Sequence, residues 1–475
     1  MDQDTSDDRV RADLAGRDAL LDDAQARARR YLSALADRRV APSAEALAAL
    51  DTIDRDLPEA GRVPAEVLAE LDDVGAAAAM ASAGGRFFGF VNGGALPVGV
   101  AAAWLTAAWD QNAALSAMAP GAARFDAVAL RWIADLLGLP AGAGGAFVTG
   151  ATMANATALA AARDAVLTAA GWDAAADGLV GAPPVEVVVG AEAHATIAKA
   201  AGLVGLGRRR FTVLPVDDQG RIVASSLPEP TGPAIVCLQA GNVNSGASDP
   251  FKPLVEWAHE AGAWVHVDGA FGLWAAASPA TAGRVAGMEG ADSWATDGHK
   301  WLNLTYDSGI CVVRDPAHLA AAVETAAPYL VAGAGREPMH YTPQSSSRAR
   351  GFEAWATLST LGRSGVAELV ERTCAHARRF ADRLGDAGFE ILNEVALNQV
   401  VVALPAAVGA TAERDAAALD ELVAAVQRDG TCWVGPTTWH GRRALRISVS
   451  SWATTTDDVD RSVDAIVAAR GAIRP

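Results

Sequence analysis

Trp264-Val265-His266-Val267-Asp268 is an apolar run that ends in a carboxylate, and Lys300, 32 residues after Asp268, ends the turn Asp297-Gly298-His299-Lys300. The run is one of seven short β-branched or apolar segments that alternate with alanine-rich helical stretches between residues 145 and 313. This alternation predicts an α/β fold with a seven-stranded, mostly parallel sheet covered by helices. The predicted strands are 146–148, 186–189, 211–214, 235–238, 264–267, 293–295 and 310–313.

In such a sheet, ligands bind beyond the carboxyl ends of the strands, which is where Asp268 and Lys300 are expected. A lysine held on a turn can form a Schiff base with an aldehyde, and a carboxylate at a strand end can keep a pyridine nitrogen protonated. The pair therefore predicts pyridoxal 5′-phosphate (PLP), attached to Lys300 and with Asp268 beside its ring nitrogen. The alternative interpretations are an ordinary surface lysine and an aspartate that caps the turn toward Phe271.

The composition excludes several classes of protein. The chain has 475 residues, 51% of them hydrophobic, and a formal net charge of −17, which argues against nucleic acid or an anionic membrane as a partner. Its four cysteines have no CxxC spacing, which predicts reduced thiols and no metal site. The charged residues 1–11 predict no signal peptide, and no apolar run approaches the ~20 residues that a membrane span requires. We therefore expect a cytoplasmic protein.

The pattern changes along the chain divide it into three predicted units. The first is helical and is cut into pieces by prolines; it could lie across another subunit or cap the large domain. Its charged first 14 residues, which show no periodicity, are expected to be disordered. The last unit follows a loop predicted at 329–347 and mixes helices with strand-like pieces. The predicted units are an N-terminal helical arm (1–84), a large α/β domain (85–330) and a small α+β domain (331–475).

The order of four motifs resembles that of the pyridoxal-dependent group II amino-acid decarboxylases, which have the aspartate-aminotransferase fold of fold-type I PLP enzymes. The motifs are the turn Val148-Thr149-Gly150-Ala151-Thr152-Met153-Ala154-Asn155, the histidine in Ala193-His194-Ala195, the strand end at Asp268, and His299-Lys300. The resemblance spans about residues 85–467 and implies a homodimer. Departures from the family pattern include Gly269, where the family often has Ala, and Thr305, where a Pro often stands.

The resemblance implies which residues hold the cofactor. The turn at Gly150, Ala151 and Thr152, with Asn155 in the helix that follows, would seat the phosphate on exposed N–H groups, and His299 would also contact it. His194 would stack on the cofactor ring and handle protons near the substrate α-carbon, although it could instead be a helix cap. Asn244, in the turn 240–246, would approach the cofactor or the substrate; a turn without such a role is equally compatible.

Further positions resemble substrate-binding elements of the family. Phe90 and Trp109 lie in stretches that would line the substrate pocket, and a hydrophobic core segment is the alternative. Arg348 belongs to a basic pair after the predicted loop, and Arg446 could clamp an α-carboxylate or form a structural salt bridge. Tyr341 lies in that loop, where a family tyrosine donates a proton after CO2 leaves and where its replacement diverts the reaction to an aldehyde.

The resemblance implies decarboxylation of an L-amino acid to its amine through a Schiff base on Lys300, with Asp268, His194 and Tyr341 as further catalytic residues. The same cofactor also serves aldehyde-forming oxidative decarboxylases, aminotransferases and carbon–carbon or carbon–sulfur lyases, so these reactions stay open. A non-catalytic subunit with the same fold is the third possibility. The sequence does not specify the side chain of the substrate.

Overall fold

The computed structural model describes residues 3–225, 227–228, 232–324, 336–405 and 411–472. Its centre is a seven-stranded sheet with the strand order β1-β7-β6-β5-β4-β2-β3, in which β7 is antiparallel to both its neighbours and the other pairs are parallel. The predicted strands and the mostly parallel arrangement are confirmed. The strands are β1 (Gly144–Val148), β2 (Glu186–Gly190), β3 (Phe211–Leu214), β4 (Ala234–Gln239), β5 (Trp264–Asp268), β6 (Ser293–Asp297) and β7 (Gly309–Val313).

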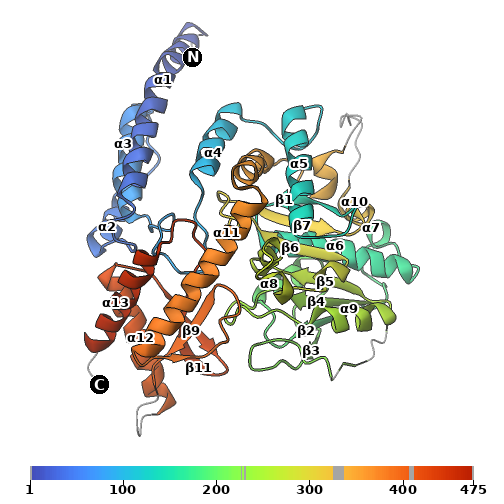
Figure 1. Ribbon diagram of the computed structural model, residues 1–475. Helices are drawn as coiled ribbons and strands as arrows, with labels where there is room; N and C mark the ends of the chain where they lie inside the picture. The colour runs from blue at the N-terminus through green and yellow to red at the C-terminus, as the bar shows by residue number, and fades with distance from the viewer. Residues whose placement is uncertain (1–2, 226, 229–231, 325–335, 406–410, 473–475) are drawn as a thin grey trace.

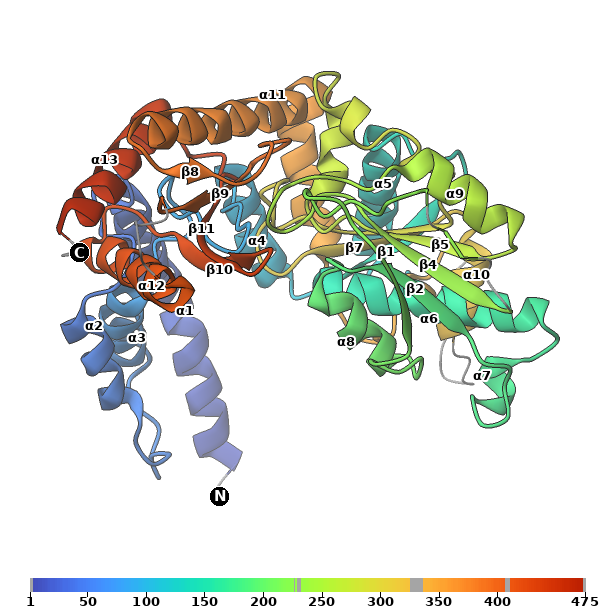
Figure 2. The same ribbon diagram turned by 90° about the horizontal axis from the view of Figure 1, so that it is seen from below.

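Helices cover both faces of this sheet, as Figure 2 shows. Alternate residues of one strand supply the two cores: Val236 of β4 packs with one helical layer and Ile235 with the other. One layer consists of α5 (Pro120–Leu136), α9 (Phe251–Glu260) and the first part of α11 (Arg350–Asp386). The other consists of α6 (Ala151–Ala169), α8 (Ala195–Leu203) and α10 (Pro316–Val323). The buried sheet therefore reads in sequence as short, nearly continuous apolar runs.

A second, antiparallel sheet forms a separate core toward the C-terminus. Its order is β10-β11-β9-β8, and α12 (Ala412–Asp429), α13 (Thr456–Ala472) and the second part of α11 pack on it. The helical path of α11 is broken at Gly362, whose φ of 60° lies in the left-handed region. The strands of this second sheet are β8 (Glu390–Ile391), β9 (Gln399–Ala403), β10 (Gly435–Trp439) and β11 (Arg442–Ser448).

The predicted domain boundaries are only partly visible in this arrangement. The boundary at 330/331 and part of the predicted loop lie outside the described residues. Near the boundary at 84/85, Phe88 packs into the core of the small sheet, and its N–H donates to the carbonyl of Trp433 at 2.9 Å. The chain therefore contacts the C-terminal sheet before it enters the large domain.

The N-terminal helices project from the body as an arm, with α1 (Gln3–Ala34) lying beside α3 (Pro64–Ala78) (Figure 1). Arg27 bridges the two helices through an ion pair with Asp72 at 3.1 Å. Because α1 begins at Gln3, the prediction of disorder was wrong for residues 3–14, while residues 1 and 2 lie outside the described residues. Pairs such as Asp8 with Arg11, one helical turn apart, favour the helix. None of the described helices combines the length and apolarity that crossing a membrane would need.

The remaining elements are short, apart from α4 (Pro97–Trp109), which follows the arm in the chain. All four cysteines are buried and unpaired. The elements are α2 (Ala44–Ala48), α4 (Pro97–Trp109), α7 (Ala174–Asp177) and the 3-10 helices η1 (Ala49–Ile53), η2 (Gly272–Ala277), η3 (Ala282–Arg284), η4 (Met288–Gly290) and η5 (Pro338–Tyr341).

The start of β7 packs directly against the turn before α6. A Cβ atom on Gly309 would lie 2.4 Å from Cα of Gly150, so only glycine fits between these backbones. We expect Gly309→Ala to lower the free energy of unfolding by about 1–3 kcal/mol, because the added methyl must push the turn away. Urea denaturation would measure the change. Gly283→Ala is the matched control, because no heavy atom lies within 4 Å of a Cβ there; equal stabilities for both variants would contradict the prediction.

Candidate active site

A cavity of about 500 Å³ opens at the carboxyl edge of the large sheet. Strands β5 and β6 end here at Asp268 and Asp297, and the turn before α6 forms another wall. Nine of the residues predicted from the sequence line this cavity. They are Phe90, Gly150, Ala151, Thr152, His194, Asp268, His299, Lys300 and Arg446.

Lys300 follows β6 and is held by an aspartate that the sequence analysis did not select. Its Nζ lies 3.1 Å from Oδ2 of Asp297, and Oδ1 of Asp297 accepts a hydrogen bond from the N–H of Ala151 at 2.6 Å. Asp297 is 3% exposed and joins the lysine turn to the start of α6. The sequence did contain a signal for this role, because Asp297 stands three residues before Lys300 in the turn Asp297-Gly298-His299-Lys300. On the other side, a Cβ on Gly93 would lie 1.8 Å from the carbonyl oxygen of Lys300, so the segment around Gly93 packs directly on this turn.

Asp268 ends β5 and is buried at the floor of the cavity. Its Oδ1 accepts a hydrogen bond from the N–H of Ala270 at 3.3 Å. Burial raises the pKa of this carboxyl, while His194, Lys300 and the amide of Asn155 act to lower it. A buried carboxylate is stabilised by a cation placed against it, and a protonated pyridine nitrogen would supply one.

His194 combines the two roles that were set against each other in the sequence. It is the N-cap of α8, where Nδ1 lies 2.8 Å from Oγ1 of Thr196, and it also lines the cavity. Desolvation lowers the pKa of its imidazole, against the opposing charge of Asp268. The ring is therefore fixed in orientation by the helix start while it faces the ligand space.

The turn before α6 supplies a seat for an anion. First-turn N–H groups of a helix have no intrahelical partner, and Thr152 and Met153, in the first turn of α6, line the cavity. An amine, a buried carboxylate, an imidazole and a helix N-terminus thus surround one space of suitable volume. This donor set fits PLP: Lys300 for the aldehyde, Asp268 for the ring nitrogen and the α6 turn for the phosphate.

Two predicted substrate residues line the same space. Phe90 is 63% exposed and stacks on Trp433, with ring centroids 5.2 Å apart. Its φ is 53°, and that of Val91 is 62°, so both residues lie in the left-handed region that non-glycine residues rarely adopt. Arg446 of β11 donates from a guanidinium nitrogen to the carbonyl of Val243 at 3.2 Å. Burial lowers the pKa of Arg446.

Five predicted site residues do not line this cavity. Asn155 lies behind Asp268, where its Oδ1 is 2.9 Å from Nε2 of His266. Asn244 accepts a hydrogen bond from Thr437 at 2.7 Å, and Trp109 is 50% exposed and packs edge-on against Phe352. The ring of Tyr341 packs under the guanidinium of Arg336, 4.2 Å from its centroid. The fifth is Arg348.

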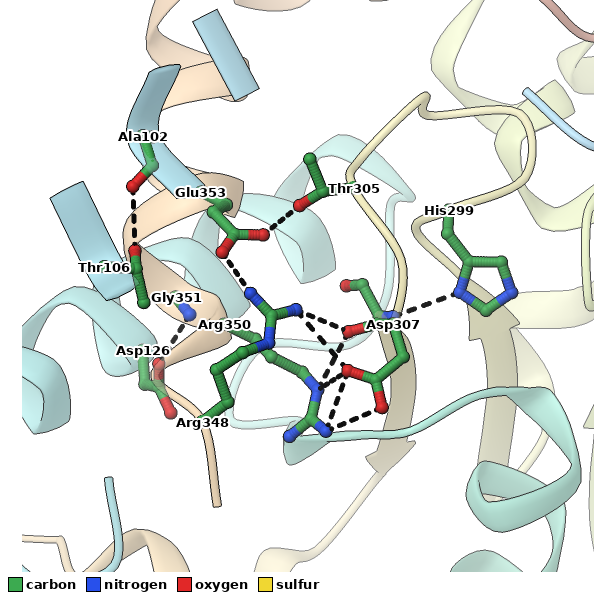
Figure 3. Close-up of polar contacts among 11 residues, drawn as sticks. Ala102, Thr106, Asp126, His299, Thr305, Asp307, Arg348, Arg350, Gly351 and Glu353 are labelled. Atoms are coloured by element: carbon green, nitrogen blue, oxygen red, sulfur yellow. Dashed lines mark hydrogen bonds and ion pairs between the residues drawn. The ribbon is translucent and has the colours of Figure 1, made fainter. Parts of the chain in front are cut away.

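Figure 3 shows that Arg348 and its neighbour Arg350 converge on Asp307. A guanidinium nitrogen of Arg348 donates to the Asp307 carbonyl at 2.9 Å, and Nε of Arg350 donates to the same oxygen at 2.9 Å and to the Asp307 carboxylate at 3.1 Å. Arg348 also pairs with Glu353, which in turn accepts a hydrogen bond from Thr305. In the described structure the basic pair therefore fixes the loop at 305–307.

This loop carries a cavity residue that the sequence analysis did not assign to the site. Tyr306 lines the cavity, and its hydroxyl donates to Oδ1 of Asn92 at 2.7 Å. Its ring packs on His299, with centroids 4.2 Å apart, while Nδ1 of His299 accepts from the N–H of Ser308 at 3.1 Å. Desolvation lowers the pKa of His299, so the neutral ring carries its proton on Nε2. The pair Tyr306-Asp307 was visible in the sequence, but its placement needed the fold.

Comparison with known proteins agrees with this geometry. Residues 49–404 match the family model described as the pyridoxal-dependent decarboxylase conserved domain. The chain is 30% identical over 362 residues to tryptophan decarboxylase 1 of Oryza sativa subsp. japonica, covering 70% of each protein. It is 27% identical over 295 residues to phenylacetaldehyde synthase of Petunia hybrida, covering 58% of this chain and 57% of that protein. The crystal structure of Oryza sativa TDC with PLP and tryptamine matches with a TM-score of 0.88 at 24% identity, covering 96% of this chain and 98% of that one.

The chain belongs to the pyridoxal-dependent decarboxylase family, because the family model spans most of its length. It is thus a member of the PLP-dependent carboxy-lyases, and its cofactor is PLP. The resemblance read from the sequence and the fold-type I architecture are both confirmed. The roles of the individual site residues stay predictions that the geometry supports.

The buried carboxyl of Asp126 should make the stability of the protein depend on pH. Asp126 accepts a hydrogen bond from the N–H of Gly351 at 2.9 Å, and burial raises its pKa to about 7 (Figure 3). The folded state therefore binds this proton more tightly than the unfolded chain, so stability should fall as the pH rises from about 4 to about 7. We expect Asp126→Asn, which keeps the acceptor oxygen, to flatten part of this fall, measured by urea denaturation across that range. An unchanged pH profile would contradict the prediction.

Proposed function

We propose that this protein decarboxylates an L-amino acid to the corresponding amine, with Lys300 as the residue that attaches the cofactor. The observation that carries the proposal is the placement of Lys300, Asp268 and His194 around one cavity at the carboxyl edge of the large sheet. The bound cofactor supplies an electron sink for the electron pair left on the α-carbon when CO2 departs.

Each protein group has a distinct part in this proposal. Asp268, buried and acceptor-only when ionised, would keep the ring nitrogen protonated. His194, fixed by Thr196, would pack on the ring and hold or move a proton beside the α-carbon. Arg446 would orient the substrate from the side of the small sheet, since this residue lines the cavity. Tyr341 as proton donor stays a prediction, because its ring lies under Arg336 rather than at the cavity of its own chain.

Oxidative decarboxylation to an aldehyde is the second candidate. It is supported by the position of Tyr341, the predicted proton donor, away from the cavity, and by the similarity to phenylacetaldehyde synthase. Assays of CO2, amine, aldehyde, ammonia and peroxide from a panel of aromatic, acidic and diamino acids would decide between the reactions. Equimolar CO2 and amine would support the main proposal, whereas equimolar aldehyde, ammonia and peroxide would replace it. Turnover without CO2 would point to transamination or lyase chemistry.

Replacement of the lysine tests the centre of the proposal. We expect Lys300→Ala to lower the rate about a thousandfold or more, because the covalent attachment and the amine near the α-carbon are lost together. Borohydride reduction followed by peptide mass spectrometry should find pyridoxyl label on Lys300 in the wild-type protein and none in the variant. The chain has two other lysines, so Lys199→Ala serves as the control that should keep both label and rate. Label at Lys199 or Lys252 would refute the assignment.

We also propose that the protein is a homodimer formed through the arm. A hollow of about 630 Å³ lies between the end of α1, α4 and residues 452–461, and its lining includes Leu32, Val100 and Trp104. Large apolar residues continue from it along the exposed surfaces of α1 and α4: Leu14, Leu21 and Leu105 are 59%, 60% and 52% exposed. Surface of this kind usually marks an interface, and a second copy would cover it.

We also propose a cytoplasmic location. The buried, unpaired cysteines favour a reducing compartment, which supports this location.

Charge placed on the arm should weaken this dimer. We expect the double variant Leu14→Glu, Leu21→Glu to shift sedimentation from dimer toward monomer at micromolar concentration, since two carboxylates would have to be desolvated in each copy. Val180→Glu is the control, because Val180 is 94% exposed and lies in a loop away from the arm. A wild-type monomer, or an arm variant that sediments like the wild type, would contradict the proposal.

A further inference from the structure

A chain of buried polar side chains runs from the core of the sheet to the back of Asp268. Nε1 of Trp264 donates to Oγ of Ser293 at 2.9 Å, and Oγ of Ser293 lies 2.9 Å from Nδ1 of His266. On the other side of the ring, Nε2 of His266 lies 2.9 Å from Oδ1 of Asn155. Ser293, His266 and Asn155 are each 0% exposed. The chain ends on the Nδ2 of Asn155, which is buried without a hydrogen-bond partner.

The direction of the hydrogen bonds in this chain follows from the chemistry of its members. An indole N–H can only donate, so Ser293 accepts from Trp264 and has its own proton free to donate to Nδ1 of His266. Burial lowers the pKa of His266 to about 3, so the ring is neutral and has one donor and one acceptor nitrogen. With Nδ1 accepting, Nε2 carries the proton and donates to Oδ1 of Asn155. Each member then uses the donor or acceptor that its neighbour requires.

The opposite direction leaves two groups unsatisfied. If Asn155 donated to Nε2 of His266, Nδ1 would carry the proton, and Ser293 would accept from both Trp264 and His266 with no acceptor for its own proton. The amide oxygen of Asn155, rather than its NH2 group, would then face Asp268. An oxygen lone pair against a buried carboxylate is unfavourable, whereas an N–H donor stabilises it. The observed contacts therefore select the orientation that presents NH2.

We propose that Asn155 is a positioning residue for Asp268, and that Trp264, Ser293 and His266 lock its amide with the NH2 group toward the carboxylate. The amide of Asn155 acts to lower the pKa of Asp268, although its Nδ2 does not reach a hydrogen bond of ordinary geometry. Asn155 was expected among the residues that touch the cofactor, but the structure places it one layer behind. Asn155 instead holds Asp268, the proposed partner of the ring nitrogen, and keeps its carboxylate ionised and directed into the cavity.

This inference rests on the role proposed above for Asp268, but not on which reaction the cavity performs. Its test uses the holoenzyme reconstituted with PLP labelled with 15N at the ring nitrogen. The 15N shift reports protonation of that nitrogen, and fluorescence titration gives the dissociation constant of the cofactor. In the wild-type protein we expect a protonated ring nitrogen over the pH range in which the fold is stable.

Two variants break the chain at different points. We expect Asn155→Leu, which removes the donor, to raise the dissociation constant for PLP about tenfold and to move the 15N shift toward the unprotonated form, because the N–H dipole that favours the ionised form of Asp268 is lost. Ser293→Ala leaves the amide in place and removes only its distant support. It should move the shift in the same direction by a smaller amount, with about a threefold weaker affinity.

Thr296→Val is the matched control for Ser293→Ala. Thr296 lies on β6 like Ser293 and is 1% exposed, but its hydroxyl has no hydrogen-bond partner. It should keep the wild-type shift and affinity. Circular dichroism establishes that each variant is folded; should Asn155→Leu fail to fold, Ser293→Ala decides alone. The inference is overturned if Asn155→Leu and Ser293→Ala, when folded, give the same 15N shift as Thr296→Val. A wild-type protein that binds PLP but decarboxylates no amino acid would refute the proposed reaction and leave this inference standing.

Discussion

The burial of one carboxylate at the end of β5 is the constraint on which the site depends. Asp268 loses the hydration that would keep it ionised, so the fold must provide compensating donors and cations around it. Ala270 donates from the turn, Lys300 and His194 bring charge or a polar ring from the segments that follow β6 and β2, and Asn155 stands behind. The protonated nitrogen of a pyridine ring would supply a further cation here, in keeping with the role proposed for Asp268.

The lysine beside this carboxylate is held by backbone as much as by side chains. Asp297 ties Lys300 to the start of α6, and the loop at 305–307 is fixed from the outside by Arg348 and Arg350. Close approach at Gly93 and Gly309 leaves the turn at Lys300 and the turn before α6 little freedom to move. The groups proposed to react therefore lie on rigid supports, as covalent cofactor chemistry requires.

The sheet and the groups next to a strand end could be predicted from the sequence, whereas the partners of side chains that meet through loops could not. Lys300, Asp268 and His194 follow strands in the chain, so parallel pairing alone brings them to one edge. Tyr341 lies in the predicted loop at 329–347 and Arg348 follows it, and no periodicity describes the path of this loop. Both residues turn to partners inside the molecule, Arg336 and Asp307. The helix from Gln3 was also missed, because its first residues show no hydrophobic periodicity, although charge pairs such as Asp8 with Arg11 are spaced for a helix.

By itself the sequence determined the fold class, the cofactor and the residues on the strand ends, because hydrophobic runs specify strands, and the side chain at the end of a strand has its position set by the sheet. The tertiary structure alone decided that Asp297 pairs with Lys300, that Tyr306 covers His299 and that Asn155 is aimed at Asp268 by His266. The contact of His266 with Asn155 joins residues 111 apart in the chain, and the hydrogen bond from Ala151 to Asp297 joins residues 146 apart. Their geometry depends on how helices and strands pack, which no local pattern encodes.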